Sequence, residues 1–173
     1  MLLPKNNRSL LKSRKVWLAS CLLLASISIA MATKAVTLPF NFAVQSFNEN
    51  CLDAKLIFMS YGKKTIERGS WVIFKPFGML SYVKDPHIVK IASGLPGDHL
   101  KIVDGNTYIN DKLVATGLPD APIVKKTPKE LERDEIIPQG KYFITATHPL
   151  SFDSRYWGYL DESQIEGKGY RLF

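Results

Sequence analysis

Residues 89–98, VKIASGLPGD, place a lysine inside an apolar run that ends in a turn rich in glycine and proline. Val89 and Ile91 are typical of a half-buried β-strand, and the Gly-Leu-Pro-Gly sequence that follows would end it. A lysine held in such a strand would lose water, which lowers the pKa of its ammonium group. A neutral amine can act as a general base, so Lys90 is the first candidate catalytic residue. The alternative is a strand lysine that points to solvent.

Short apolar runs and turns alternate along most of the chain. A hairpin is expected around Asp104-Gly105, because this dipeptide favours the tight turn between two paired strands. Segment 116–138 is rich in proline and charge, which predicts a solvated excursion with one helical turn near 128–132. Many short strands with few helical periods favour a mainly β domain, a sandwich or a partly open barrel. The expected strands lie at 51–59, 69–74, 89–93, 100–103, 107–109, 110–114 and 142–146.

The N-terminus carries a basic head followed by an uncharged stretch. Residues 1–15 hold five basic residues and no acid, and residues 16–32 contain no charged residue. This pattern predicts a cytoplasmic head (1–15), a transmembrane anchor (16–34) and an extracytoplasmic domain (35–173). Ala30-Met31-Ala32 has the small-x-small form of a signal-peptidase site, so a cleaved signal peptide is the alternative.

The net charge of +7 comes mostly from that head. The other 18 basic and 16 acidic residues nearly balance, whereas nucleic-acid binding would need a basic face on the folded part. We therefore expect no nucleic-acid partner. The three histidines have no ligand-like spacing, so we expect no metal site and no cofactor.

Cys21 and Cys51 are the two cysteines of the chain, and Cys21 lies inside the predicted anchor. A membrane-spanning Cys21 cannot reach Cys51, so Cys51 is expected to be a free thiol in a compartment that favours disulfides. Such a leftover thiol suggests a reactive or partner-seeking residue. The alternative is a small buried side chain.

Three short motifs resemble the boxes of type I signal peptidases. Residues 90–98 (KIASGLPGD) are similar to the lysine box, and residues 151–158 (SFDSRYWG) are similar to the final Asp-Ser-Arg box. Residues 69–72 (GSWV) resemble the Gly-Asp-x-Val box, with Ser70 in place of the aspartate. The resemblance covers roughly residues 48–160. It is closest to the TraF-like pilin-maturation peptidases of conjugation, because residues 147–152 (THPLSF) replace a Gly-Asp-Asn loop and the domain is small.

This resemblance implies a compact signal-peptidase-like β barrel or sandwich with an N-terminal transmembrane helix. The family places a serine, a hydrophobic residue and a proline at the start of the first strand. Aligned on Leu52, the serine position holds Cys51 and the proline position holds Asp53. Ser46 lacks the following motif and Ser60 lies at the far end of the predicted strand, so Cys51 is the preferred nucleophile over these alternatives.

Roles follow from the resemblance, residue by residue. Cys51 would attack the scissile carbonyl and Lys90 would transfer the proton, in the manner of a thiolate and an ammonium group that stabilise each other. Ser154 would orient the lysine by a hydrogen bond. Asp153 and Arg155 would pair and brace the loop.

The function implied is that of a membrane-anchored endopeptidase that trims or cyclises a conjugative pilin or another secreted precursor. The bacterial inner membrane would hold the chain by a single pass, with the N-terminus in the cytoplasm and the catalytic domain in the periplasm. Partners would be the precursor and other proteins of the conjugation apparatus. The alternative is a non-catalytic envelope assembly factor that keeps the peptidase fold.

Overall fold

The computed structural model describes residues 17, 20–24, 39–44, 52–63, 65–81, 83–84 and 86–172. Contacts divide the chain into two units, Met1–Leu38 and Pro39–Phe173. In the first unit, residues 17 and 20–24 are helical and exposed. The head 1–15 and the rest of the predicted anchor 16–34 lie outside the described residues. Among the residues that are described, no helix combines the length and the apolar character that a bilayer crossing requires.

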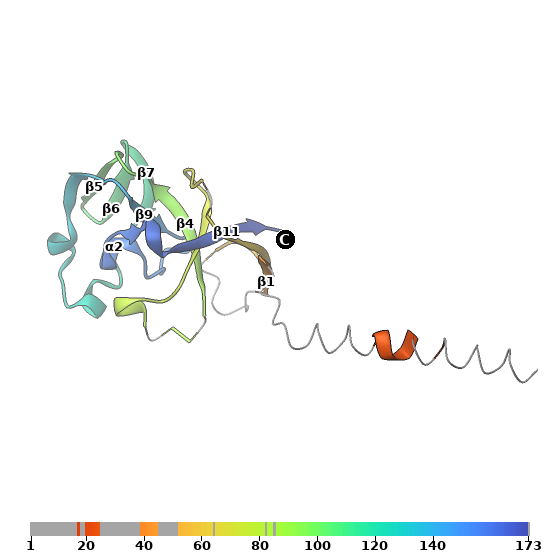
Figure 1. The fold of residues 1–173 in the computed structure, drawn as a ribbon. Coiled ribbons are helices and arrows are strands. Elements are labelled where there is room, and N and C mark those ends of the chain that lie inside the picture. Colours follow the sequence, from red (N-terminus) through yellow and green to blue (C-terminus); the bar gives the residue numbers. More distant parts are fainter. Residues whose placement is uncertain are drawn as a thin grey trace, which may run out of the picture. The chain divides into compact units, whose positions relative to one another are not determined.

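The second unit is built on a large antiparallel sheet (Figure 1). Its strands follow the order β1-β2-β11-β3-β4-β9-β10, so strands from both ends of the domain meet at its centre. Their bounds are β1 (Phe40–Val44), β2 (Leu56–Tyr61), β3 (Trp71–Phe74), β4 (Ile88–Gly94), β9 (Lys141–Thr145), β10 (Leu160–Asp161) and β11 (Ile165–Arg171).

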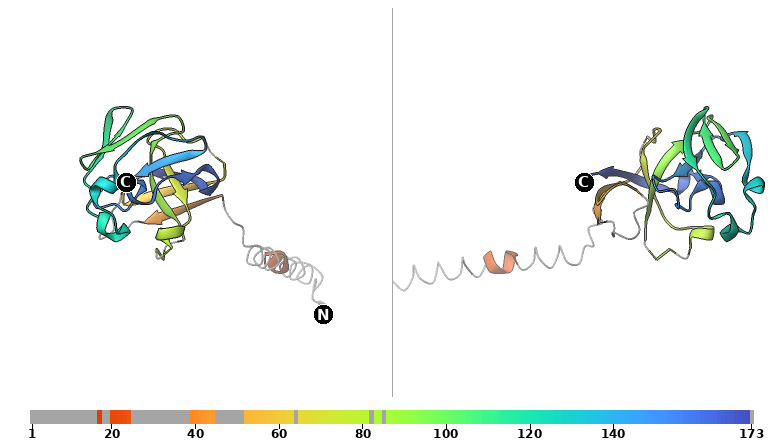
Figure 2. Two further views of the ribbon diagram at one scale, coloured as in Figure 1. Left: turned by 90° about the vertical axis from the view of Figure 1, so that its left-hand side faces the viewer. Right: turned by 180° about the vertical axis from the view of Figure 1, so that it is seen from behind.

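A smaller antiparallel sheet has the order β7-β6-β5-β8 (Figure 2). Its strands are β5 (His99–Val103), β6 (Asn106–Ile109), β7 (Lys112–Thr116) and β8 (Arg133–Ile136). Short helices connect the strands: η1 (Gly78–Leu80), η2 (Ala121–Val124), η3 (Pro128–Leu131), α2 (Ser154–Trp157) and η4 (Glu162–Gln164). The mainly β prediction is confirmed. Neither sheet closes on itself among the described strands, so the domain has no closed barrel there.

Two tight turns join three consecutive strands of the smaller sheet, and their residues favour this geometry. Asp104 and Gly105 both have positive φ, 49° and 75°, as a type I′ hairpin turn requires. The next turn, at Asn110 and Asp111, also has positive φ at both residues. The hairpin predicted at Asp104-Gly105 is therefore confirmed, and the short strand expected at 110–114 forms as β7, two residues further along the chain. The excursion predicted for 116–138 is only partly right: η3 forms near the expected helical turn, but β8 pairs with β5 inside the same segment.

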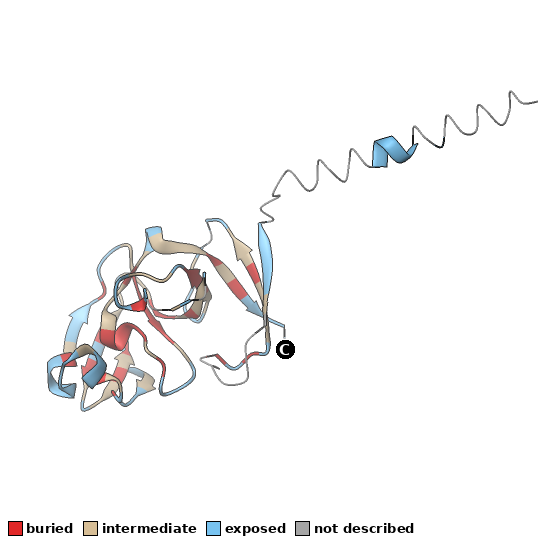
Figure 3. Cartoon of the chain, turned by 90° about the horizontal axis from the view of Figure 1, so that it is seen from below, coloured by how far each residue is buried: buried red, intermediate tan, exposed pale blue. Residues whose placement is uncertain are grey.

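Three apolar clusters pack around the two sheets, and buried residues follow the strands (Figure 3). Val72 and Ile73 are neighbours on β3 but belong to different clusters, so both faces of the large sheet are covered. A third cluster joins Leu100 of the smaller sheet to Phe143 of β9 and Tyr156 of α2. The large sheet is therefore buried on both faces near β4, which places any polar residue of that strand in a dry environment.

Gly94 ends β4 where three side chains crowd its backbone. A Cβ atom at this position would lie 2.5 Å from Ile137 Cδ1 and 2.9 Å from Ile109 Cδ1. The first glycine of the Gly-Leu-Pro-Gly turn is thus needed for close packing between β4 and the smaller sheet.

Candidate active site

Lys90 lies at the centre of β4 and only 5% of it is exposed. Its Nζ donates a hydrogen bond to Ser151 Oγ at 2.7 Å, and Ser151 is fully buried. β4 lies inside the large sheet, between β3 and β9, and apolar clusters cover the faces of this sheet, which explains the burial. A buried amine must be hydrogen-bonded to offset the loss of water, and Ser151 supplies one such bond. The desolvated lysine expected from the sequence is present.

Ser151 is a site residue that the sequence did not reveal. The hydrogen bond to Lys90 was expected from Ser154, but Ser154 Oγ instead accepts from the Ile144 amide at 2.9 Å and ties α2 to β9. Both hydroxyls belong to the same SFDS motif. The choice depends on a turn in which Ser151 N donates to His148 O at 3.1 Å, and sequence periodicity does not describe such a turn.

Asp153 and Arg155 form the pair that the sequence predicted. Arg155 Nε donates to Asp153 Oδ1 at 2.8 Å and Nη2 donates to Oδ2 at 3.0 Å, with both residues almost fully buried. Asp153 also caps α2, because its Oδ1 accepts from the Arg155 amide. Burial alone would lower the pKa of Arg155, but the hydrogen bond and charge of Asp153 outweigh it and hold that pKa above its usual value. The guanidinium is therefore a permanent cation inside the domain.

The same guanidinium holds four backbone carbonyls. Nη1 donates to Thr116 O at 3.2 Å and to Gly117 O at 2.9 Å, where β7 ends. Nη2 donates to Pro149 O at 3.3 Å and to Ser151 O at 2.9 Å. Arg155 thus fixes the backbone of Ser151, the residue that contacts Lys90, against the end of the smaller sheet.

The turn after β4 is held by Asp98. Its carboxylate accepts from Leu95 N at 2.6 Å, from Arg68 Nη2 at 2.7 Å and from Asn110 Nδ2 at 2.8 Å. Burial would raise the pKa of Asp98, but these hydrogen bonds outweigh it and keep that pKa below its usual value. Asp98 therefore anchors the lysine-bearing strand to its neighbours as an ionised side chain.

Cys51 lies outside the described residues, but the two residues after it make defined contacts. Leu52 is fully buried, and Asp53 N donates to Thr147 Oγ1 at 3.1 Å. The Asp53 carboxylate pairs with Arg171 Nη1 at 3.0 Å. The segment that follows Cys51 is thus tied to residue 147, at the start of the loop that leads to Ser151.

Ser60, one alternative nucleophile, is separated from Lys90 by the sheet itself. The register runs from Lys90 to Val72, from Val72 to Lys168 and from Lys168 to Ser60. Three steps between strands of about 4.8 Å each place the two residues about 14 Å apart. Ser60 is therefore out of reach of the lysine. Ser46 lies outside the described residues.

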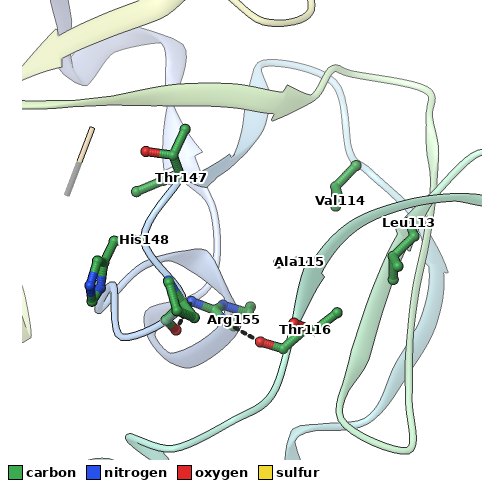
Figure 4. A pocket seen from close by; sticks show the side chains of 9 residues that line it. Leu113, Val114, Ala115, Thr116, Thr147, His148 and Arg155 are labelled. Carbon is green, nitrogen blue, oxygen red and sulfur yellow. Dashed lines mark hydrogen bonds between the residues drawn. The ribbon is translucent and has the colours of Figure 1, made fainter. Parts of the chain in front are cut away.

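A pocket of about 410 Å³ opens beside this site, between β7 and the loop that follows β9 (Figure 4). Thr147 and His148 lie on the loop side, and Leu113 and Val114 lie on the β7 side. Arg155 also lines the pocket, at the point where it bonds to Thr116.

Comparisons with known proteins agree with these motifs. The family model described as "Signal peptidase, peptidase S26" matches residues 14–173. A "Probable signal peptidase I-2" of Synechocystis sp. is 30% identical over 118 residues, 66% of this chain and 51% of that protein. A "Signal peptidase IB" of Staphylococcus aureus is 26% identical over 174 residues, 88% of this chain and 85% of that protein. This chain thus spans about half the length of the Synechocystis relative.

A solved signal peptidase I from Enterococcus faecalis aligns at 23% identity with a TM-score of 0.39, over 62% of this chain and 98% of that chain. The family model spans nearly the whole sequence, including the lysine box and the final Asp-Ser-Arg box. This chain belongs to the signal peptidase family, peptidase S26.

Proposed function

We propose that this chain is a membrane-anchored endopeptidase that cleaves a secreted precursor, with Cys51 as the nucleophile and Lys90 as the proton carrier. The observation that carries the proposal is the buried Lys90 amine, held 2.7 Å from Ser151 Oγ within a motif of this peptidase family. A purely structural lysine in a sheet buried on both faces would cost free energy without any gain in packing. The position of Lys90 therefore favours catalysis.

The chemistry follows from a thiol paired with an amine. The Cys51 thiolate attacks the scissile carbonyl carbon, and the carbonyl electron pair moves to oxygen. When the adduct collapses, the C–N bond breaks and the Lys90 ammonium gives its proton to the leaving amine. The neutral Lys90 then takes a proton from water, whose oxygen attacks the thioester and releases the new carboxyl group and the thiolate. Ser151 would keep the amine aimed at the reacting groups throughout.

A narrower substrate class is a conjugative pilin precursor in the periplasm. The replacement of a Gly-Asp-Asn loop by residues 147–152 and the small domain support this branch of the family. The thioester could pass to water, which gives a linear product, or to the amine of the substrate's own chain, which gives a ring. A conjugative pilin precursor and an Ala-x-Ala peptide, incubated separately with the full chain in detergent, would separate this branch from general signal-peptide processing. Mass spectrometry of the pilin product would separate hydrolysis from cyclisation.

Replacing Cys51 by alanine should reduce cleavage of the pilin precursor and of the Ala-x-Ala peptide to the uncatalysed background, because the proposed acyl-enzyme forms on the Cys51 sulfur. Cys21→Ala is the matched control and should retain full activity, since Cys21 lies in the N-terminal unit and is exposed. The measurement is the initial rate of cleavage by the full chain. If Cys51→Ala and Lys90→Ala both supported assembly of the conjugation apparatus at the normal level, the chain would instead be a non-catalytic assembly factor.

Replacing Ser151 by alanine should lower kcat roughly ten-fold to a hundred-fold, because the Lys90 amine loses a buried partner. The pH dependence of kcat should shift as well, since that bond acts on the group that transfers the proton. Ser154→Ala is the control: it removes the bond to Ile144 N, so it should reduce stability by about 1 kcal/mol and leave the pH profile unchanged. Equal pH profiles for the two variants would contradict the role given to Ser151.

A further inference from the structure

The open edge of β7 and the pocket beside it form a surface that the catalytic proposal does not use. We propose that this surface binds the polypeptide substrate in an extended conformation, as a strand added to β7, with one aliphatic side chain of the substrate in the pocket against Leu113. The inference rests on the proposed peptidase function and adds to it a second recognition site, next to the loop that carries Ser151.

β7 offers an unpaired backbone. It stands at one end of the smaller sheet and pairs with β6 alone. Among the described residues, Leu113, Val114 and Ala115 have no backbone partner other than β6, while Thr116 O accepts from Arg155. The outward N–H and C=O groups of an edge strand can pair with an extended peptide, which is a common mode of peptide recognition.

A bulge lies at the centre of this edge. The β6–β7 register shifts between Thr107 and Tyr108, whose partners are Ala115 and Leu113, so Val114 has no partner on β6. Val114 packs against the core of the smaller sheet, while Leu113 remains 49% exposed. Bulges are frequent next to binding sites because they change the direction of side chains. Here the bulge leaves a leucine beside the pocket in contact with water.

Two residues of the pocket wall, Arg155 and Thr147, are hydrogen-bonded to the segments around the proposed catalytic groups. Arg155 Nη2 bonds both to Pro149 O, on the pocket wall, and to Ser151 O, on the residue that holds Lys90. Thr147, another wall residue, accepts from the Asp53 amide two residues after Cys51. Figure 4 shows β7 and the 147–148 loop on opposite sides of the pocket. A peptide that contacts Thr147 and Pro149 on the loop side of the pocket would therefore lie next to β7.

The chemistry of the pocket favours an aliphatic side chain. Leu113, Val114, Ala115 and Pro149 supply apolar wall, and no acidic residue lines the pocket among the described residues. The Arg155 guanidinium, which also lines the pocket, is already paired with Asp153 and hydrogen-bonded to four carbonyls. Burial of a methyl-bearing side chain against Leu113 would remove apolar surface of both partners from water.

The test uses the full chain in detergent. The substrates are internally quenched peptides with an Ala-x-Ala junction. Each position that flanks the junction carries Leu, Ala, Ser or Glu in turn. Wild type should prefer leucine at one flanking position, and Leu113→Ala should reduce that preference in kcat/KM roughly ten-fold. Leu113→Arg should instead raise the relative cleavage of peptides with Glu at the same position. Methylation of the substrate backbone nitrogen next to that position should lower kcat/KM with the wild-type enzyme, because an edge-pairing donor is lost.

Ile136 provides the matched control. It lies on β8, at the opposite edge of the same sheet, and is 59% exposed. Ile136→Ala and Ile136→Arg should leave every preference unchanged. If wild type cleaves the peptides but the Leu113 variants keep the wild-type preference, this inference is overturned and the peptidase proposal stands. If wild type cleaves no peptide and no pilin precursor, both are overturned.

Discussion

Replacing Lys90 by methionine should lower kcat for precursor cleavage by about 10³-fold, within the range found when a positioned acid or base is removed. Methionine keeps the apolar stem that packs inside β4 but has no amine to donate to the leaving group. The fold should remain intact, because the cost of leaving the buried Ser151 hydroxyl without this partner, about 1–3 kcal/mol, is offset in part by removing a buried amine. Initial rates of cleavage by the full chain, together with its thermal unfolding midpoint, test both statements.

Lys101→Met is the matched control for this experiment. Lys101 also lies on a strand, β5, but its side chain is 46% exposed and its nearest acid, Asp134, is 4.0 Å away. Surface pairs of this kind contribute little, so the variant should cleave at the wild-type rate. If Lys90→Met retained more than half of the wild-type rate, Lys90 would have no catalytic role.

Replacing Arg155 by methionine should lower the free energy of unfolding by about 3–5 kcal/mol. The substitution leaves the Asp153 carboxylate buried without its partner, and it removes the donors of four carbonyls at the same time. Urea unfolding of the full chain in detergent, followed by tryptophan fluorescence, measures the change. Activity should fall with stability, because the backbone of Ser151 loses its anchor.

Two further variants test whether the unpaired, buried Asp153 carboxylate causes this loss of stability. Arg171→Met breaks the exposed pair with Asp53 and should cost about 1 kcal/mol or less. The double variant Arg155→Met with Asp153→Leu should be less destabilised than Arg155→Met alone, because no unpaired charge then remains in the interior. A cost for Arg155→Met no larger than that for Arg171→Met would show that the buried pair does not hold the loop.

Local chemistry made much of the fold predictable. Asp104 and Gly105 favour one type of tight turn, and the strands on either side had to pair in the register that this turn sets. The strand that carries Lys90 was predictable because the apolar residues next to the lysine favour a buried β-strand. β8 was not, since the sequence Arg-Asp-Glu-Ile of residues 133–136 is polar and becomes a strand only because the edge of β5 is available to it.

The candidate site was predictable only in part, because Ser151, the hydrogen-bond partner of Lys90, was not foreseen. The lysine and the Asp153–Arg155 pair follow from short motifs, and their burial follows from the sheet around them. The choice between Ser151 and Ser154 depends on the path of an irregular loop, which no repeating pattern encodes. The distance from Ser60 to Lys90 depends on the strand order, which brings the C-terminal strand β11 between β2 and β3.

Apart from the Asp153 carboxylate, the groups that accept hydrogen bonds from the Arg155 side chain all belong to the main chain. Its contacts at positions 116, 117, 149 and 151 are all to carbonyl oxygens, which every amino acid possesses. These contacts around Lys90 therefore do not depend on which amino acids occupy the four positions. New specificities could be engineered by randomising His148, Pro149 and Leu150, without rebuilding the loop that carries them.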